Sequence, residues 1–177
     1  MKDYQIVAPS WAANEKYEVI ANMPAGADRS QAPAMLRTLL ESRFHLQTHS
    51  ETRSLPVYAL VTTKGGAKLV AADGPLNRRG GDAWVDHGMG HLRALNSSAA
   101  VFADLLTKVS DRPVIDGTGL SGIFNFDLTY SPELSASLND RPTLAAALAE
   151  LGLKLEKRDT KIEVLVVDHS DKLPTGN

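Results

Sequence analysis

Cysteine is missing from this chain, and its absence removes several chemistries at once. None of the 177 residues carries a thiol, so disulfides, zinc–thiolate sites, iron–sulfur clusters and thiol nucleophiles are excluded. A long apolar run is missing too, because no stretch approaches the about 20 residues of a membrane-spanning helix. The N-terminal MKDYQIVAPSW lacks the apolar region of a signal peptide. We therefore expect no transmembrane segment and no export signal in this chain, and its localisation stays unknown.

Charge of one sign is also scarce. The 19 basic and 21 acidic residues are spread along the sequence and give a formal charge of −2, so no basic field attracts phosphate backbones, and we expect no nucleic-acid partner. With 43% hydrophobic and 23% charged residues, the composition is that of an ordinary globular protein. A chain of this length buries an apolar core and folds alone.

Strand and helix patterns are present in an order that occurs twice. Each copy predicts a strand, a helix and a hairpin. In the first copy these are YEVIANM at 17–23, a helix capped by Asp28 or Ser30 and running to about Arg43, and the hairpin of HLQTHSE with PVYALVTT. In the second they are FNFDLTY at 124–130, TLAAALAEL at 143–151, and the hairpin of LKLEKRD with KIEVLVVD.

This order predicts an internal repeat over about 17–70 and 124–173. The segment SAAVFADLLTKVS, capped by Asn96 or Ser97, predicts a helix between the copies, and residues 70–95 read as an irregular loop. One β-α-β-β unit leaves a helix stripe and a sheet face half covered, so the two should bury them together. We expect an α+β fold of two β-α-β-β units with a central helix and antiparallel or mixed sheets, as a single compact domain over 1–177 or two tightly joined halves.

The stretch RPVIDGTGLSGIFNFDLTY reads as a turn followed by a strand. The Asp116 carboxylate can accept hydrogen bonds from backbone N–H groups two positions on, and the glycines supply positive φ. Ser121 does not form a nucleophile elbow, because GTGLSG lacks the Gly-x-Ser-x-Gly spacing and precedes a strand. This stretch therefore predicts scaffold rather than a catalytic loop.

Two groups of residues could bind a metal ion. Asp86, His87 and His91 offer histidines four apart on one helical turn beside a carboxylate, although the intervening glycines disfavour a helix and no glutamate supplies a general base. Asp116, Asp127 and His169 could instead surround a hard cation such as calcium, which would polarise an ester or lactone carbonyl. The alternatives are solvated loop residues in the first group, and turn and cap residues in the second.

Aromatic and strand-edge surfaces suggest binding without chemistry. Trp11, Trp84 and Tyr58 could line a groove for sugar or peptide, although single aromatics more often pack in a core or rim. The edges of the predicted hairpins could accept a partner strand. His45 and His49 alternate on one predicted strand and read as exposed polar positions.

Three long segments resemble an uncharacterised soil-bacterial family that is abundant in acidobacteria. They are MLRTLLESRFHLQTHSETRSLPVYALVTTKGGAKL, DRPVIDGTGLSGIFNFDLTYSPE with its Pro-Val-x-Asp-x-Thr-Gly-Leu-x-Gly signature, and LAELGLKLEKRDTKIEVLVVDHSDKLPTGN. The HGMGH segment matches no family motif. The family has no established activity, and its frequent export signals imply an extracytoplasmic or periplasmic setting. By topological analogy, the predicted units look like interaction modules at the N-termini of secretins and TonB-dependent receptors.

The sequence favours a non-catalytic binding or interaction module of the bacterial envelope, because its glycine and aspartate motifs serve turns. A protein or a small molecule is the expected partner. The alternative is a hydrolase of a small ester or lactone that depends on calcium or zinc, with His87 or His169 as the catalytic histidine. A divalent metal is the one cofactor that this alternative requires.

Overall fold

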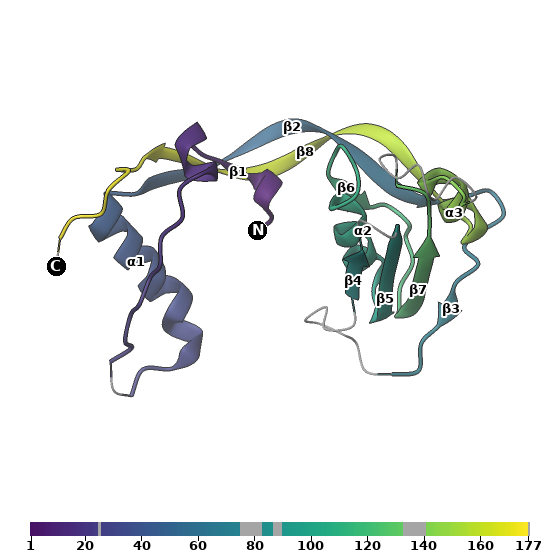
Figure 1. Cartoon of the computed structure of the whole chain (residues 1–177), viewed down its shortest axis with the longest axis horizontal. Helices are drawn as coiled ribbons and strands as arrows, with labels where there is room; N and C mark the ends of the chain where they lie inside the picture. Colours follow the sequence, from purple (N-terminus) through teal and green to yellow (C-terminus); the bar gives the residue numbers. More distant parts are fainter. Residues whose placement is uncertain (25, 75–82, 87–89, 133–140, 177) are drawn as a thin grey trace. The chain divides into compact units, whose positions relative to one another are not determined.

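The chain divides into two compact units in a computed structural model that describes residues 1–24, 26–74, 83–86, 90–132 and 141–176. Unit 1 consists of Met1–Ser54 and Lys161–Asn177, and unit 2 is the continuous segment Leu55–Thr160. Two long strands, β2 (Gln47–Thr62) and β8 (Leu153–His169), contribute residues to both units (Figure 1).

Unit 1 is built around one helix, α1 (Ala32–Phe44). The carboxylate of Asp28 accepts a 2.7 Å hydrogen bond from the backbone N–H of Ser30 and caps the 3-10 turn η3 (Arg29–Gln31) that leads into the helix. The predicted cap of the helix itself is wrong, because the residue at the N-cap of α1 is Gln31, which makes no side-chain cap hydrogen bond. The helix ends at His45, whose φ of 47° is left-handed. The shorter elements of unit 1 are η1 (Asp3–Gln5), β1 (Ile6–Val7), η2 (Ser10–Ala13) and η3 (Arg29–Gln31). Strand β1 pairs in parallel with β8 at Leu165 and Val166.

The apolar residues of unit 1 are poorly covered. Among its described residues only Val164 is buried, and α1 contains no buried residue. Large side chains of this unit that stay exposed are Met1, Ile6, Tyr17, Val19, Ile20, Met23, Leu36 and Leu173. Unit 1 therefore has almost no apolar core of its own.

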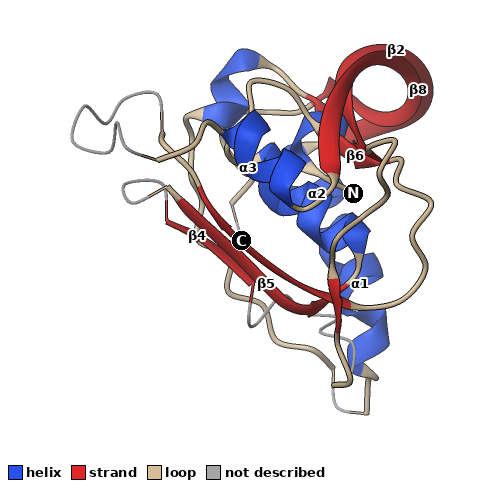
Figure 2. Ribbon diagram, turned by 90° about the vertical axis from the view of Figure 1, so that its right-hand side faces the viewer, coloured by secondary structure: helices blue, strands red, loops and turns tan. Residues whose placement is uncertain are grey.

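Unit 2 contains a four-stranded antiparallel sheet with the strand order β3-β7-β5-β4. Figure 2 shows its helices α2 and α3 on one side of this sheet. The elements are β3 (Val70–Ala71), β4 (Ala83–Asp86), β5 (His91–Ser97), α2 (Ala99–Thr107), β6 (Val114–Asp116), β7 (Phe124–Thr129) and α3 (Leu144–Glu150). Strand β6 pairs in parallel with β2 at Tyr58–Leu60.

The core of unit 2 centres on two stacked rings. Phe102 of α2 and Phe126 of β7 lie with their centroids 4.1 Å apart and their planes 8° apart. Leu60, Leu92, Leu106, Leu148 and Leu153 are completely buried in the same cluster. Since these side chains come from helices and from both sheets, unit 2 has the continuous core that unit 1 lacks.

The α+β class and the three predicted helices are confirmed, but both predicted hairpins are wrong. Each hairpin region is a single continuous strand, and β2 and β8 are neighbours in the sheet order β1-β8-β2-β6. The hairpins were predicted because polar residues in the middle of each of these two regions resemble a turn. Residues 47–56 of β2 are instead largely exposed, so polar side chains suit them. Pro56 lies outside the stretch of β2 that pairs with β6.

Two smaller expectations also need correction. Residues 17–23 form no strand, and part of the supposed loop over 70–95 folds as β4 and β5. The cap of α2 is Ser98, whose hydroxyl accepts from the backbone N–H of Val101; Asn96 adopts a left-handed φ of 47° instead. The internal duplication stays a prediction, although both proposed copies contain a helix followed by a long strand. None of the described helices has the length and hydrophobicity that crossing a membrane requires.

Candidate functional site

The first predicted metal group does not lie on a helical turn. Asp86 and His91 face each other across the antiparallel pair of β4 and β5, and His87 lies outside the described residues. The structure instead brings His91 to Asp127, with its Nε2 atom 2.6 Å from a carboxylate oxygen of that residue. Arg93 approaches the other oxygen of Asp127 at 3.6 Å.

The second predicted group is divided. Asp116 stays within its own turn, where its carboxylate accepts hydrogen bonds from the backbone N–H of Thr118 at 2.9 Å and from the hydroxyl of the same residue at 2.7 Å. The predicted Asp116 turn is therefore confirmed. Asp116 and Asp127 belong to unit 2, and His169 belongs to unit 1. The described residues include no cluster of three or more histidines and carboxylates that could hold a metal ion.

A histidine–carboxylate network in unit 1 was missed by the sequence reasoning. His45 Nδ1 lies 2.6 Å from one oxygen of Asp171, and His169 Nε2 lies 3.2 Å from the other. His49 Nδ1 lies 2.8 Å from Asp168. Hydrogen bonding to Asp168 raises the pKa of His49, and hydrogen bonding from His45 lowers the pKa of Asp171. These contacts depend on which strands are neighbours, which spacing along the chain does not reveal.

Unit 2 has a hollow of about 1030 Å³, which we call the Tyr58 hollow. Strand β2 contributes Tyr58, the chain after α2 contributes Ser110 and Asp111, and Tyr130 follows β7. The remaining lining residues are Val109, Ser131, Pro132, Thr143, Leu144, Ala145, Lys154 and Leu155. The sequence analysis singled out Tyr58 as a groove residue; the structure places Trp11 in η2 of unit 1 and Trp84 on β4.

The hydroxyl groups of Ser110, Tyr58 and Tyr130 are among the polar groups of the residues that line the Tyr58 hollow. The Oγ atom of Ser110 is buried and has no hydrogen-bond partner among the described residues. Burial, followed by a hydrogen bond with Asp111 and the charge of that residue, raises the pKa of Tyr58. Burial followed by the charge of Asp86 raises the pKa of Tyr130. Both phenols therefore stay protonated at neutral pH and remain hydrogen-bond donors.

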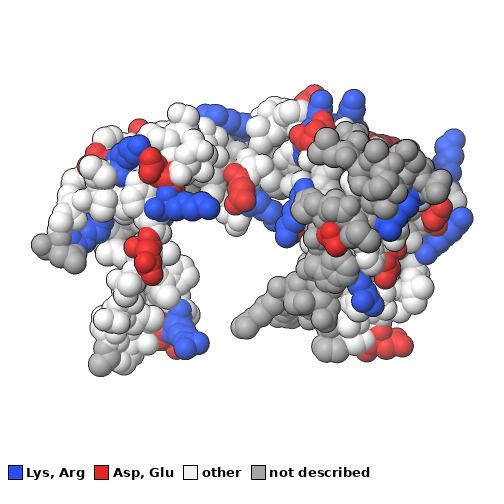
Figure 3. Space-filling view, viewed as in Figure 1, with Lys and Arg blue, Asp and Glu red and all other residues white. Residues whose placement is uncertain are grey.

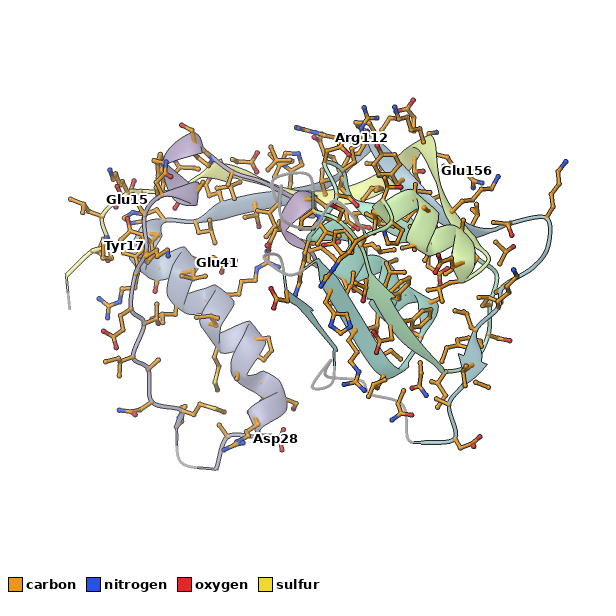
Figure 4. The ribbon with its side chains drawn as sticks, turned by 45° about the vertical axis from the view of Figure 1, so that its right-hand side comes forward. Glu15, Tyr17, Asp28, Glu41, Arg112 and Glu156 are labelled. Atoms are coloured by element: carbon orange, nitrogen blue, oxygen red, sulfur yellow. The ribbon has the colours of Figure 1, made fainter. Side chains whose placement is uncertain are left out.

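The charged groups of the Tyr58 hollow have protein partners. Lys154 Nζ lies 2.7 Å from the carboxylate of Glu156. Asp111 lies 3.5 Å from the guanidinium of Arg112, which also sits over the ring of Tyr58 at 5.8 Å from its centroid. Figure 4 labels Arg112 and Glu156 on unit 2, and on the face shown in Figure 3 the described basic and acidic side chains are interspersed. The hollow thus offers hydroxyls and apolar surface rather than an unpaired charge.

Comparison with known proteins gives a family and no activity. No curated protein matches the chain, and no solved structure matches it. A family model described as "Protein of unknown function (DUF3738)" matches residues 1–170. This match confirms the expected membership of an uncharacterised family, whereas the soil-bacterial origin and the turn signature stay predictions. The chain therefore belongs to the DUF3738 family of proteins of unknown function.

Proposed function

We propose that this protein is a non-catalytic binding module whose Tyr58 hollow takes a small, uncharged, hydroxyl-rich ligand such as a short saccharide. The observation that carries the proposal is the buried Ser110 hydroxyl, which has no hydrogen-bond partner among the described residues, in a hollow that two protonated tyrosines also line. An unsatisfied buried polar atom costs about 1–3 kcal/mol. A ligand that hydrogen-bonds to Ser110 would recover part of that cost.

The remaining lining agrees with a neutral ligand. Leu144, Leu155 and Val109 supply apolar surface against which the C–H face of a sugar ring can pack. The volume of the hollow lies near the upper end of typical ligand sites, about 300–1,000 Å³. The charged groups already have partners, so a charged ligand would have to displace them.

The chemistry of the lining favours binding over catalysis. Its described residues include no histidine, and the ammonium group of Lys154 is engaged by Glu156. Ser110 consequently has neither a histidine nor an unpaired lysine in the described lining to activate it as a nucleophile. The envelope setting implied by the family resemblance would suit a receptor of this kind.

The test is a titration of the full chain with neutral mono- to tetrasaccharides, followed by backbone amide chemical shifts in NMR. We expect shifts at Tyr58, Ser110 and Tyr130, and affinity reduced about 2- to 10-fold by Ser110→Ala, the loss of one neutral hydrogen bond. Ser42→Ala is the matched control, because its hydroxyl bonds to its own helix α1. Saccharide-induced shifts elsewhere, or equal effects of the two serine variants, would contradict the proposal.

The alternative function has one supporting observation. His91 and Asp127 form a close histidine–carboxylate pair, and Asp86 lies opposite His91 in the strand register. A calcium or zinc ion near this pair would support hydrolysis of a small ester or lactone. Ester and lactone substrates assayed with and without chelator distinguish the two functions: chelator-sensitive turnover that His91→Ala abolishes would establish the hydrolase.

A further inference from the structure

Residues 17–23 have the sequence of a strand but no strand partner in the part of the chain that the structure describes. Tyr17, Val19, Ala21 and Met23 alternate with Glu18, Ile20 and Asn22. Among the described residues, no backbone–backbone hydrogen bond involves this segment. Figure 1 shows it as a separate length of chain beside α1. Its N–H and C=O groups are therefore available for pairing.

The side chains of this segment are unusually exposed for their chemistry. Ile20 is 85% exposed, and Val19 and Met23 are 47% and 39% exposed. Because Val164 is the only buried residue among those described in unit 1, the unit gains little from burying apolar surface within itself. A partner that covers residues 17–23 would supply part of the missing core.

One end of the segment is held against the rest of unit 1 by side-chain contacts. The ring of Tyr17 packs edge-on against Phe44 at the end of α1, with centroids 5.1 Å apart, and its hydroxyl donates to the backbone carbonyl of Lys172. Lys172 also holds Glu15 at 2.5 Å. Figure 4 shows Glu15 and Tyr17 near one end of α1 and Asp28 near the other. Tyr17, Val19 and Met23 are 40%, 47% and 39% exposed, against 85% for Ile20, so these three odd-numbered side chains are better covered than Ile20.

The pattern of the segment is symmetric about Ile20. If two copies run antiparallel with Ile20 opposite Ile20, Tyr17 faces Met23 and Val19 faces Ala21, which gives one wholly apolar face. On the other face Glu18 lies opposite Asn22, so no like charges meet. Pro24, which has no N–H, follows at the boundary. This self-complementarity is what an isologous interface requires.

We propose that residues 17–23 pair antiparallel with the same segment of a second copy of this chain, centred on Ile20. A two-stranded ribbon alone is marginal in water. Here its apolar face would lie toward α1 of both copies, where Leu36 is 47% exposed. This interface belongs to unit 1 and is independent of the ligand proposed for unit 2.

Engineered cysteines test the register, because the chain has no native thiol. Directly opposed residues in an antiparallel pair have Cα atoms about 4.5–5.5 Å apart, which a disulfide spans. Oxidised Ile20→Cys should therefore form a covalent dimer. Glu18→Cys should not, because the two copies of that position lie about 13 Å apart along the strands. A mixture of Glu18→Cys and Asn22→Cys should cross-link. Equal cross-linking of the two single variants, or none, overturns the proposal.

Oligomeric state provides the second test. Sedimentation of the wild-type chain over a range of concentrations should show a monomer–dimer equilibrium, and Ile20→Asp should abolish the dimer by opposing two carboxylates. Leu173→Asp is the matched control, because Leu173 is 76% exposed in the same unit, and it should leave the dimer intact. Far-UV circular dichroism checks that both variants fold. A wild-type chain that stays monomeric at every concentration overturns the proposal. This holds even if residues 17–23 pair with a strand of a different protein.

Discussion

At the scale of single residues, His49 of unit 1 is expected to have a raised pKa. Hydrogen bonding to Asp168 raises the pKa of His49, so NMR titration should find it above the ordinary value of about 6.5. Asp168→Asn removes that partner and should lower the pKa. An unchanged His49 pKa in Asp168→Asn would show that the contact does not form in solution.

The same contact predicts how stability varies with pH. A histidine whose folded pKa is raised adds stability that is complete below the unfolded pKa and is lost as the pH rises through the folded pKa. The melting temperature of the wild type should therefore exceed that of Asp168→Asn more at pH 6 than at pH 8.5. Thermal unfolding monitored by circular dichroism measures both melting temperatures. A difference between the two proteins that is the same at pH 6 and pH 8.5 would refute the prediction.

Some residue roles were readable from the sequence and others were not. The Asp116 turn was predictable because its hydrogen bonds reach only two positions along the chain. Tyr58 was noticed as an aromatic, but its neighbours Ser110 and Tyr130 come from other elements. Nothing in the sequence indicates that the hydroxyl of Ser110 is buried without a partner, because burial depends on the packing of distant segments.

At the scale of elements, two leucines on helices should differ sharply in their contribution to stability. Leu106 of α2 is completely buried, whereas Leu36 of α1 is 47% exposed. Leu106→Ala should lower the free energy of unfolding by about 2–5 kcal/mol, and Leu36→Ala should change it by less than about 1 kcal/mol. Urea denaturation of both variants measures the difference. Equal losses would mean that α1 is covered in solution to the same extent as α2.

Two glycines offer a comparable test of the turns. Gly119 and Gly152 both have positive φ, but a Cβ at Gly119 meets nothing within 4 Å, whereas one at Gly152 would lie 2.0 Å from the carbonyl oxygen of Gly66. Gly119→Ala should cost about 1–2 kcal/mol from the backbone conformation. Gly152→Ala should cost a further about 1–3 kcal/mol, because the chain must move. Denaturant titrations in which Gly119→Ala proves the more damaging would contradict this reading.

The elements that sequence reasoning recovered are the local ones. Helices α2 and α3 have side-chain caps, α1 follows the capped turn η3, and β7 shows its alternation over 124–129. Strands β2 and β8 were wrongly predicted to be hairpins. Each is a long strand because it pairs with the other, which lies about a hundred residues away in the chain. Local polar positions look the same in a turn and in an exposed strand.

At the scale of the whole molecule, the two units should differ in their rates of amide hydrogen exchange. Core amides of unit 2, such as those of Leu92 and Phe126, belong to completely buried residues and should exchange slowly. Amides of α1 should exchange faster, because that helix has no buried residue. Exchange followed by mass spectrometry measures both. Equal protection at low protein concentration would contradict the unequal cores.

Unit 2 is one uninterrupted stretch of the chain, whereas unit 1 is assembled from two pieces that lie on either side of it. On the ribosome, the residues of unit 2 are all synthesised before Lys161 is added, so unit 2 can fold while unit 1 still waits for its second piece. A nascent chain can therefore form the Tyr58 hollow before it completes the unit that contains residues 17–23. Association between copies would then follow synthesis rather than accompany it.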